Sequence, residues 1–309
     1  MVLGLAAFFT GSSAKADSTT GVVGFYPVSL PSGNSAWVCG LVTQEAFVGA
    51  PTTVTSDVNG KAVVTFSDVD WAVGTFPLHY AEPQSGICQG LAIDILSHTA
   101  NSITLDTTPA AAGLSTSVVL TVRKHATIGG LLPTSGGLTP FSDSISIINS
   151  SGLQQTYYFN NIAGYWITGA NVNSTNAVIR PGQGMIIQVN TAKTLMLGTG
   201  EVCHVKSTPS KTRAYPGVPN ILGPINPLGN NTTLGALGVR TSLLAWSDTL
   251  VTLAPGSLLQ TGLYVNTGSY LMSSLGQNGE GHTLPAGSGV VIGVNAAKNI
   301  SLSPVTVSP

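Results

Sequence analysis

Gly182-Gln-Gly-Met-Ile-Ile-Gln-Val-Asn-Thr-Ala-Lys193 recurs 105 residues later as Gly287-Ser-Gly-Val-Val-Ile-Gly-Val-Asn-Ala-Ala-Lys298. Phe141-Ser-Asp-Ser-Ile-Ser-Ile-Ile recurs at the same offset as Trp246-Ser-Asp-Thr-Leu-Val-Thr-Leu. Both stretches alternate apolar and polar residues, which is typical of strands with one buried face. A repeat of this length indicates a duplicated domain. We therefore expect two homologous β-domains in tandem, residues 126–205 and 231–309.

Shorter matches lie between these anchors. Tyr157-Tyr-Phe-Asn160 corresponds to Leu263-Tyr-Val-Asn266, and Gly164-Tyr-Trp-Ile-Thr168 corresponds more loosely to Gly268-Ser-Tyr-Leu-Met272. The repeated features are apolar alternation, glycine and amides, without a repeated nucleophile, base or metal ligand. The duplication thus favours a structural role over a catalytic one.

The part before the repeats also has the pattern of short antiparallel strands. Its clearest element is a hairpin, Pro51–Val58 and Lys61–Phe66, because Asn59-Gly60 suits a type I′ turn. Residues 17–125 are therefore predicted to form a small N-terminal β-barrel or sandwich. Further strands are expected at Val22–Leu30, Ala36–Val42, Thr75–Tyr80, Gly90–Leu96, Ser102–Asp106 and Val118–Arg123.

Two segments border the repeats. Single helical turns are expected to open them, at His125–Leu132 and Thr233–Gly238. Residues 206–230 contain five prolines and are predicted to be an extended connector with little secondary structure. The basic stretch Lys206–Arg213 lies in this connector and is interpreted as solvated.

Only 7% of the 309 residues are charged, and the net charge is −1. Nucleic acid is a poor partner, because phosphate binding needs clustered Lys and Arg. No apolar run approaches the roughly 20 residues of a membrane-spanning helix. In residues 231–309 the formal charges are Arg240, Asp248, Glu280 and Lys298. So little charge favours association.

The first 16 residues have the pattern of an export signal. An apolar stretch, Val2–Phe9, precedes Ala14-Lys-Ala16, an A-x-A cleavage pattern, but a basic region before it is missing. The alternative is that the segment is retained and packs on the protein itself or on a neighbouring subunit. Three cysteines allow three pairings, of which Cys39 with Cys88 is preferred; an unpaired Cys203 beside His204 is interpreted as inert.

Aromatic residues concentrate at Tyr157, Tyr158, Tyr165 and Trp166. They are interpreted chiefly as core, with a glycan-binding patch as the alternative. The glycine-rich loop Pro181–Gly184 lacks a phosphate-binding pattern, so its glycines are expected to supply positive φ or a close backbone approach. Asp57, Asp68 and Asp70 lack calcium-loop spacing and are interpreted as turn residues. The five histidines form no catalytic motif, so no catalytic, cofactor-binding or metal-binding residue is assigned.

Several short motifs together carry a resemblance. They are Gly24-Phe-Tyr-Pro-Val-Ser-Leu-Pro-Ser-Gly33, the elements between Gly86 and Asp106, Thr121-Val-Arg-Lys-His125, Tyr157-Tyr-Phe-Asn160 and Val178-Ile-Arg-Pro-Gly-Gln-Gly-Met-Ile-Ile187. The chain resembles an uncharacterised paralogous family of exported proteins of Verrucomicrobia and related bacteria. The resemblance implies export and an extracellular role, and it supplies no activity.

From the sequence we expect a secreted, all-β, non-enzymatic structural subunit that self-assembles into an extracellular filament, sheath or surface layer. The expected partners are further copies of the chain. The alternative is a carbohydrate-binding or adhesive module that uses an extracellular glycan. A secreted hydrolase is the third and least favoured hypothesis, because the sequence shows no hydrolase motif.

Overall fold

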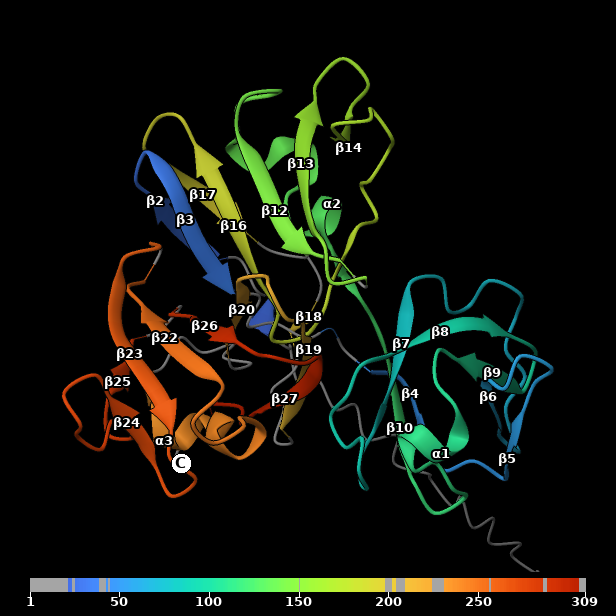
Figure 1. Cartoon of the computed structure of the whole chain (residues 1–309). Helices are drawn as coiled ribbons and strands as arrows, with labels where there is room; N and C mark the ends of the chain where they lie inside the picture. Colours follow the sequence, from blue (N-terminus) through green and yellow to red (C-terminus); the bar gives the residue numbers. More distant parts are fainter. Residues whose placement is uncertain are drawn as a thin grey trace, which may run out of the picture.

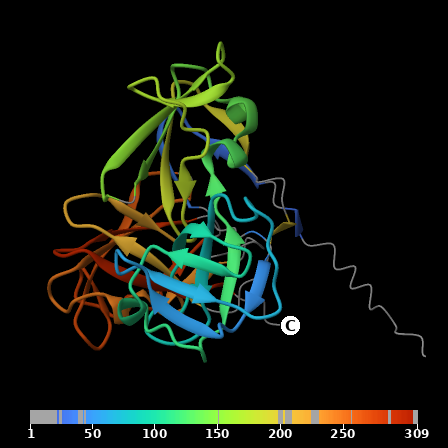
Figure 2. The same ribbon diagram turned by 90° about the vertical axis from the view of Figure 1, so that its right-hand side faces the viewer.

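The computed structural model describes residues 22–23, 26–38, 43, 45–149, 151–197, 202–203, 209–223, 231–255, 257–285 and 288–305. In these residues strands predominate, and the three α-helices are four residues long each. The predicted all-β fold is thus confirmed. The predicted signal peptide, residues 1–16, lies outside the described residues. Figure 1 shows three lobes, and Figure 2 shows the same lobes from the side.

The first repeated domain, copy 1, is built on a five-stranded antiparallel sheet. Its strands are β14 (Tyr165–Thr168), β13 (Gln154–Asn160), β12 (Ser144–Ile148), β16 (Gly184–Val189) and β3 (Gly33–Val38), in this spatial order. Two short ladders complete the domain: β2 (Tyr26–Leu30) with β17 (Lys193–Leu197), and β11 (Ala126–Thr127) with β15 (Val178–Ile179). After β11 come α2 (Ile128–Leu131) and the 3₁₀-helix η1 (Pro133–Gly137). The core includes Ile128, Ile145, Trp166 and Ile187.

The second repeated domain, copy 2, has the same plan. Its sheet contains β20 (Asn220–Leu222), β26 (Val290–Gly293), β22 (Thr249–Leu253), β23 (Gln260–Asn266) and β24 (Leu271–Ser273), in this order. Its ladders are β19 (Ser210–Ala214) with β27 (Lys298–Leu302), and β21 (Thr232–Thr233) with β25 (Thr283–Leu284). The helices α3 (Leu234–Leu237) and η2 (Val239–Ser242) follow β21. The helical turns expected at the start of each copy are therefore present.

Between β3 and β11 of copy 1 lies a separate lobe, the inserted domain, residues 45–124. Its single sheet has the order β4-β10-β7-β8-β9-β6-β5, seen in blue, cyan and green at the lower right of Figure 1. The strands are β4 (Glu45–Gly49), β10 (Leu120–Lys124), β7 (His79–Pro83), β8 (Ile93–His98), β9 (Ser102–Leu105), β6 (Ala62–Thr65) and β5 (Thr53–Ser56). A short helix, α1 (Pro109–Ala112), joins β9 to β10. One further pair, β1 (Val22–Val23) with β18 (Val202–Cys203), forms a separate two-stranded ladder.

Strand pairing differs from the boundaries expected from the sequence in two places. β2 and β3 pair within copy 1, although they were assigned to the N-terminal domain, residues 17–125. β19 and β20 pair within copy 2, although residues 206–230 were expected to have little secondary structure. Apolar alternation predicts a strand and its buried face but does not identify its partner.

The predicted hairpin around Asn59 is present, but its turn is of another kind. Strands β5 and β6 close at Ser56 and Ala62, and the Gly60 N–H donates to Asp57 O at 3.0 Å. Gly60 alone takes positive φ, while the Asp57 carboxylate accepts the N–H groups of Asn59 and Lys61 at 2.8 Å each. This Asp-capped five-residue loop therefore replaces the expected two-residue type I′ turn.

The correspondence between the copies shifts by one residue in the middle strands. Ser144 pairs with Tyr158, whereas its counterpart Thr249 pairs with Val265. The cause is a bulge in β23 next to Thr252, which adds one residue to that strand. The position of Tyr157 is thus taken by Tyr264 and not by Leu263, and burial raises the pKa of both tyrosines.

The two copies pack on each other through the sheet faces that point away from their own cores, here called the outer faces. Ala36 and Ile186 of copy 1 meet Ile221, Val251 and Val291 of copy 2. The described residues include no helix that is long and apolar enough to cross a membrane.

The glycine-rich loop before β16 makes this packing possible. A Cβ on Gly184 would lie 2.3 Å from Ile221 Cγ2, and Gly182 has φ +76°. Both roles expected for these glycines, positive φ and close approach, are therefore confirmed.

Candidate functional site

In each copy a largely buried ion pair joins the ends of two strands. In copy 1, Lys193 at the start of β17 donates to the carboxylate of Asp143, which directly precedes β12. The same carboxylate accepts the Thr139 N–H at 2.7 Å and the Asn190 N–H at 3.0 Å. Burial alone raises the pKa of Asp143, but the hydrogen bonds from Lys193 and from the two backbone N–H groups outweigh it. The pKa therefore lies below the ordinary value.

Copy 2 repeats the arrangement. Asp248 accepts Lys298 Nζ at 2.5 Å, the Leu244 N–H at 2.7 Å and the Asn295 N–H at 3.4 Å. The repeats thus share an ionisable pair, which was not expected from the sequence. The signal was present, because each aromatic-Ser-Asp triplet and each Val-Asn-x-Ala-Lys stretch contains one of its members.

The ion pair holds the loop that presents an exposed aromatic ring. Phe141 and Trp246 stand two residues before Asp143 and Asp248 and have φ values of 56° and 60°. Left-handed backbone is rare for a bulky residue and costs about 1–3 kcal/mol. Their exposed fractions, 50% and 67%, are large for aromatic side chains. We call Phe141 and Trp246 the aromatic corners of the two copies.

Beside the corner of copy 1 lies an open hollow of about 710 Å³ in total, here called the copy 1 hollow. Its lining residues are Phe141, Tyr158, Asn160, Ile167, Thr168, Gly169 and Asn171. No residue of this lining carries a formal charge. The Asn160 Oδ1 accepts the N–H groups of Ile162 and Ala163 at 3.0 Å each, which fixes the orientation of its amide.

The predicted aromatic patch is divided between two faces of the sheet. Trp166 and Tyr157 are buried in the core of copy 1, and Trp166 Nε1 donates to Leu132 O at 3.1 Å. Tyr158 lines the copy 1 hollow, and Tyr165 is half-buried opposite Asn160. Phe141 and Asn171 come from loops outside the aromatic cluster, so sequence proximity did not indicate them.

The outer face of copy 2 is apolar at the corresponding positions. Tyr158 is replaced by Val265, and Ile167 by Met272, because these residues pair in the same way in the two sheets. Leu263, two residues before Val265, pairs with Val251, which belongs to the contact between the copies. The apolar surface of that contact thus continues along β23 beyond the area that copy 1 covers.

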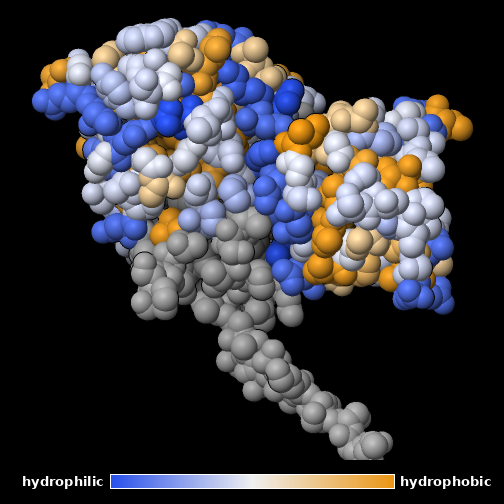
Figure 3. Space-filling view, turned by 90° about the horizontal axis from the view of Figure 1, so that it is seen from below, coloured by the Kyte–Doolittle hydropathy of each residue, from blue (hydrophilic) through white to orange (hydrophobic). Residues whose placement is uncertain are grey.

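A polar cluster joins the inserted domain to copy 1. Asp94 on β8 accepts His125 Nε2 at 2.9 Å and an Arg180 guanidinium N–H at 2.7 Å. Burial raises the pKa of Asp94. The hydrogen bond from His125 and the charge of Arg180 lower this pKa by more than burial raises it, so the net shift is downward. Figure 3 shows a hydrophilic band along the inner side of the inserted domain, the lobe at the right.

The same cluster resembles an Asp–His pair of a hydrolase, yet it lacks a nucleophile among the described residues. His125 is buried and its Nδ1 has no hydrogen-bond partner. A catalytic histidine needs a hydroxyl or thiol on the nitrogen that faces away from its aspartate. The geometry therefore supports a structural role for this cluster, in which it links the inserted domain to copy 1.

Other predicted residues take structural places. Asp57 caps its turn as expected, and the described part of the chain contains no group of three or more metal-ligating side chains. Cys88 is a buried free thiol that donates to Ala111 O at 3.5 Å. Its predicted partner Cys39 lies outside the described residues. The stretch containing Lys211 and Arg213 forms β19 and is not a solvated connector.

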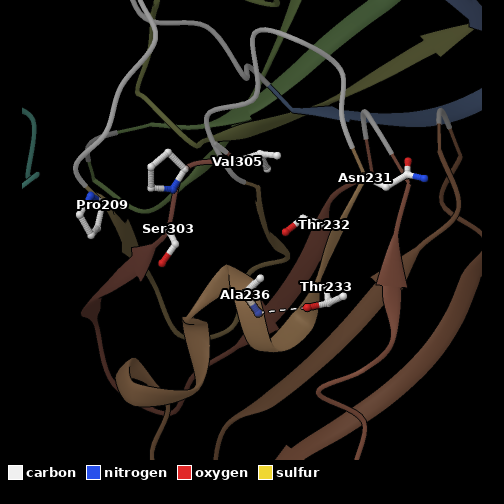
Figure 4. Close-up of a pocket in the computed structure, with 8 residues that line it drawn as sticks. Pro209, Asn231, Thr232, Thr233, Ala236, Ser303 and Val305 are labelled. Carbon is white, nitrogen blue, oxygen red and sulfur yellow. Dashed lines mark hydrogen bonds between the residues drawn. The ribbon is translucent and has the colours of Figure 1, made fainter. Parts of the chain in front are cut away.

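A further hollow, of about 970 Å³ in total, lies in copy 2 between β21, α3 and the chain after β27 (Figure 4). The Thr233 hydroxyl points to the Ala236 N–H of α3, with 3.2 Å between the two atoms, and so caps the helix. The lining of this hollow is neutral and includes Pro209, Ser303, Pro304 and Val305. The arrangement offers no acid, base or nucleophile with a shifted pKa.

The fold and the paired outer faces define an all-β protein of two homologous domains, the first of which is interrupted by a third. Comparisons with protein-family models, curated proteins and solved structures found no match to the chain.

Proposed function

We propose that the chain is a secreted, non-enzymatic structural subunit that associates with further copies of itself in an extracellular filament, sheath or surface layer. The observation that carries the proposal is the apolar strip on the outer face of copy 2. This strip consists of Trp246, Leu263, Val265 and Met272. It continues the apolar contact with copy 1. Trp246 and Leu263 are exposed to solvent, and Val265 and Met272 are half-buried.

Exposed apolar surface of this kind marks interaction sites in soluble proteins. The contact between the copies shows what covers such a face in this chain: the outer face of a homologous sheet. A second copy of the chain offers the same surface and is the occupant that we propose.

Charge does not oppose this association. The four charged side chains of residues 231–309 form two internal ion pairs, Asp248 with Lys298 and Arg240 with Glu280, the latter at 2.8 Å. Residues 231–309 therefore carry no unpaired charge on a Lys, Arg, Asp or Glu side chain. The other two charged residues of copy 2, Lys211 and Arg213, lie on β19, outside the five-stranded sheet. Two copies of the outer face of this sheet thus meet without net repulsion.

The strand edges of the two repeated sheets contribute little to this association. The edge strands β14 and β24 are covered by the loops that follow them, with isolated bridges from Ile167 to Asn173 and from Met272 to Asn278. Such covering prevents pairing with other chains. The proposed contact is therefore face to face rather than edge to edge.

The test measures mass in solution. We expect the mass from light scattering to rise with concentration for the natural chain and to stay that of a monomer for Trp246→Gly combined with Leu263→Ser. Glycine suits the left-handed backbone at position 246. Leu153→Ser, which removes an exposed leucine elsewhere, should change nothing. A natural chain that stays monomeric at its highest soluble concentration would contradict the proposal.

A further inference from the structure

The two copies share one scaffold but carry different side chains on their outer faces. Their ion pairs, helical turns and sheet orders match, and so does the position of each aromatic corner. The duplicated scaffold is thus an internal reference. Differences at equivalent outer-face positions are not required by the fold.

At these positions copy 1 carries a phenol and two amides, whereas copy 2 has a valine, a threonine and a glycine. Tyr158 corresponds to Val265 and Asn160 to Thr267, by the pairing of β12 with β13 and of β22 with β23. Asn171 corresponds to Gly276, because both take positive φ in turns closed by the same hydrogen bonds. Asn171 adopts φ 58°, a conformation that glycine accommodates better. Copy 1 thus has an amide at a position where copy 2 has glycine.

These groups surround the exposed ring of Phe141 in the copy 1 hollow. An aromatic face beside amides and a phenol is suited to a sugar ring, whose C–H face stacks on the aromatic and whose hydroxyls bond to the amides. The lining is uncharged, which favours a neutral sugar over an acidic one.

A second hollow lies directly beyond the end of β14. It is about 760 Å³ in total and is lined by Asn149, Gln155, Asn173 and Asn176 together with Tyr157. Thr168 lines both hollows. A ligand of several linked sugar units can therefore cross the sheet edge at Thr168 and contact the amides of both hollows.

We infer that the outer face of copy 1 is a binding site for a neutral polysaccharide, with Phe141 as its stacking platform and Tyr158, Asn160 and Asn171 as its hydrogen-bonding groups. The site is separate from the apolar strip of copy 2, so it does not depend on the proposed self-association. A subunit with both surfaces is an anchor between an assembly and a carbohydrate matrix.

The test uses native electrophoresis through gels that contain hydroxyethylcellulose, laminarin, galactomannan or xyloglucan, with alginate as an acidic comparison. The Trp246→Gly, Leu263→Ser chain serves as the background, so that self-association does not affect mobility. We expect at least one neutral polysaccharide to retard this chain more than alginate does. Calorimetry with the matching hexasaccharide and disaccharide then tests the second hollow, and we expect the hexasaccharide to bind about tenfold more tightly.

Two sets of variants assign the site. Phe141→Gly removes the ring but keeps the left-handed backbone, and should weaken binding about tenfold. The triple exchange Tyr158→Val, Asn160→Thr, Asn171→Gly installs the residues of copy 2 and should abolish retardation. Copy 2 folds with the corresponding valine and glycine, but Asn160→Thr also removes two hydrogen bonds of the turn, so we expect a lower but still cooperative thermal unfolding transition. The inference is overturned if no neutral polysaccharide retards the chain, if alginate binds more tightly, or if the folded variants bind like their background.

Discussion

Asp143 and Lys193 lie 50 residues apart in the chain and form an ion pair inside copy 1, and Asp248 and Lys298 form the same pair at the same separation in copy 2. Each pair ties the loop before the first central strand to the start of the last strand of its domain. Each aromatic corner lies inside the turn that its aspartate closes by accepting the N–H of Thr139 or Leu244.

Removing the cation of either pair should destabilise the domain that contains it. Lys193→Met and Lys298→Met each leave a buried carboxylate without its counter-ion, which costs about 3 kcal/mol. Urea unfolding of the two variants measures the loss. Lys61→Met is the control, because the ion pair of Lys61 with Asp106 is exposed and contributes at most about 1 kcal/mol. Equal stability of all three variants would contradict a structural role for the buried pairs.

The chain should lose stability in acid. The pKa values of Asp94 and Asp143 lie below their ordinary value of 3.8 in the folded protein. The stabilisation that the two carboxylates supply is therefore complete above that pH. It declines as the pH falls toward the folded pKa values, because the unfolded chain takes up protons first.

Urea midpoints at pH 7, 4 and 3 test this dependence. Asp143→Asn should be less stable than the natural chain at pH 7 and should lose less further stability between pH 4 and pH 3. Asp70→Asn, at an exposed position of the inserted domain, should follow the natural curve. An acid limb that is unchanged in Asp143→Asn would show that this carboxylate does not contribute to it.

The junction between the inserted domain and β19 depends on a glycine. Gly90 has φ +78°, and a Cβ there would lie 1.9 Å from Pro209 O. Lys211 N–H also donates to Gly90 O at 2.8 Å. Gly90→Ala should therefore displace β19 and lower stability by more than about 2 kcal/mol. Gly74→Ala is a matched control with φ +83° and open space around it, and should cost only about 1 kcal/mol.

The contact between the copies should be equally sensitive to one methyl group. Gly184→Ala places its Cβ against Ile221 and its backbone, and should lower the free energy of unfolding by about 1–3 kcal/mol. Gly281→Ala, with no atom within 4 Å of the added Cβ, should be nearly neutral. Thermal unfolding compares the two. If Gly184→Ala were as stable as Gly281→Ala, the close packing of the two outer faces would be wrong.

Local pattern predicted much of the fold but little of its connectivity. Alternation indicated the central strands of both copies, β12 and β16 in copy 1 and β22 and β26 in copy 2. The threonines before the helical turns, Thr127 and Thr233, fit their role as caps. It did not show that β2 and β3 pair with strands near residue 190, because pairing partners are not encoded in a local period. The bulge in β23 was not predicted either. Leu263-Tyr-Val-Asn266 matches Tyr157-Tyr-Phe-Asn160 in residue type, but the bulge places Tyr264, and not Leu263, at the position of Tyr157.

The candidate site was predictable only in part. Tyr158 belonged to the aromatic cluster singled out from the sequence, whereas Phe141 and Asn171 reach the same hollow from other loops. Loops converge through the tertiary fold, so residue type and spacing alone could not bring them together. The ion pairs were more accessible, because both members recur in the repeated segments.

The inserted domain has a consequence for the order in which the protein folds. Ser29 on β2 lies opposite Thr194 on β17, 165 residues later in the chain. Contacts so distant in sequence form slowly and only after the later segment is present. The strands of the interrupting lobe come from one continuous segment and are free to close early. The first strands of copy 1 must wait, unpaired, until almost two thirds of the polypeptide has emerged, which makes this sheet the natural point for a chaperone to act.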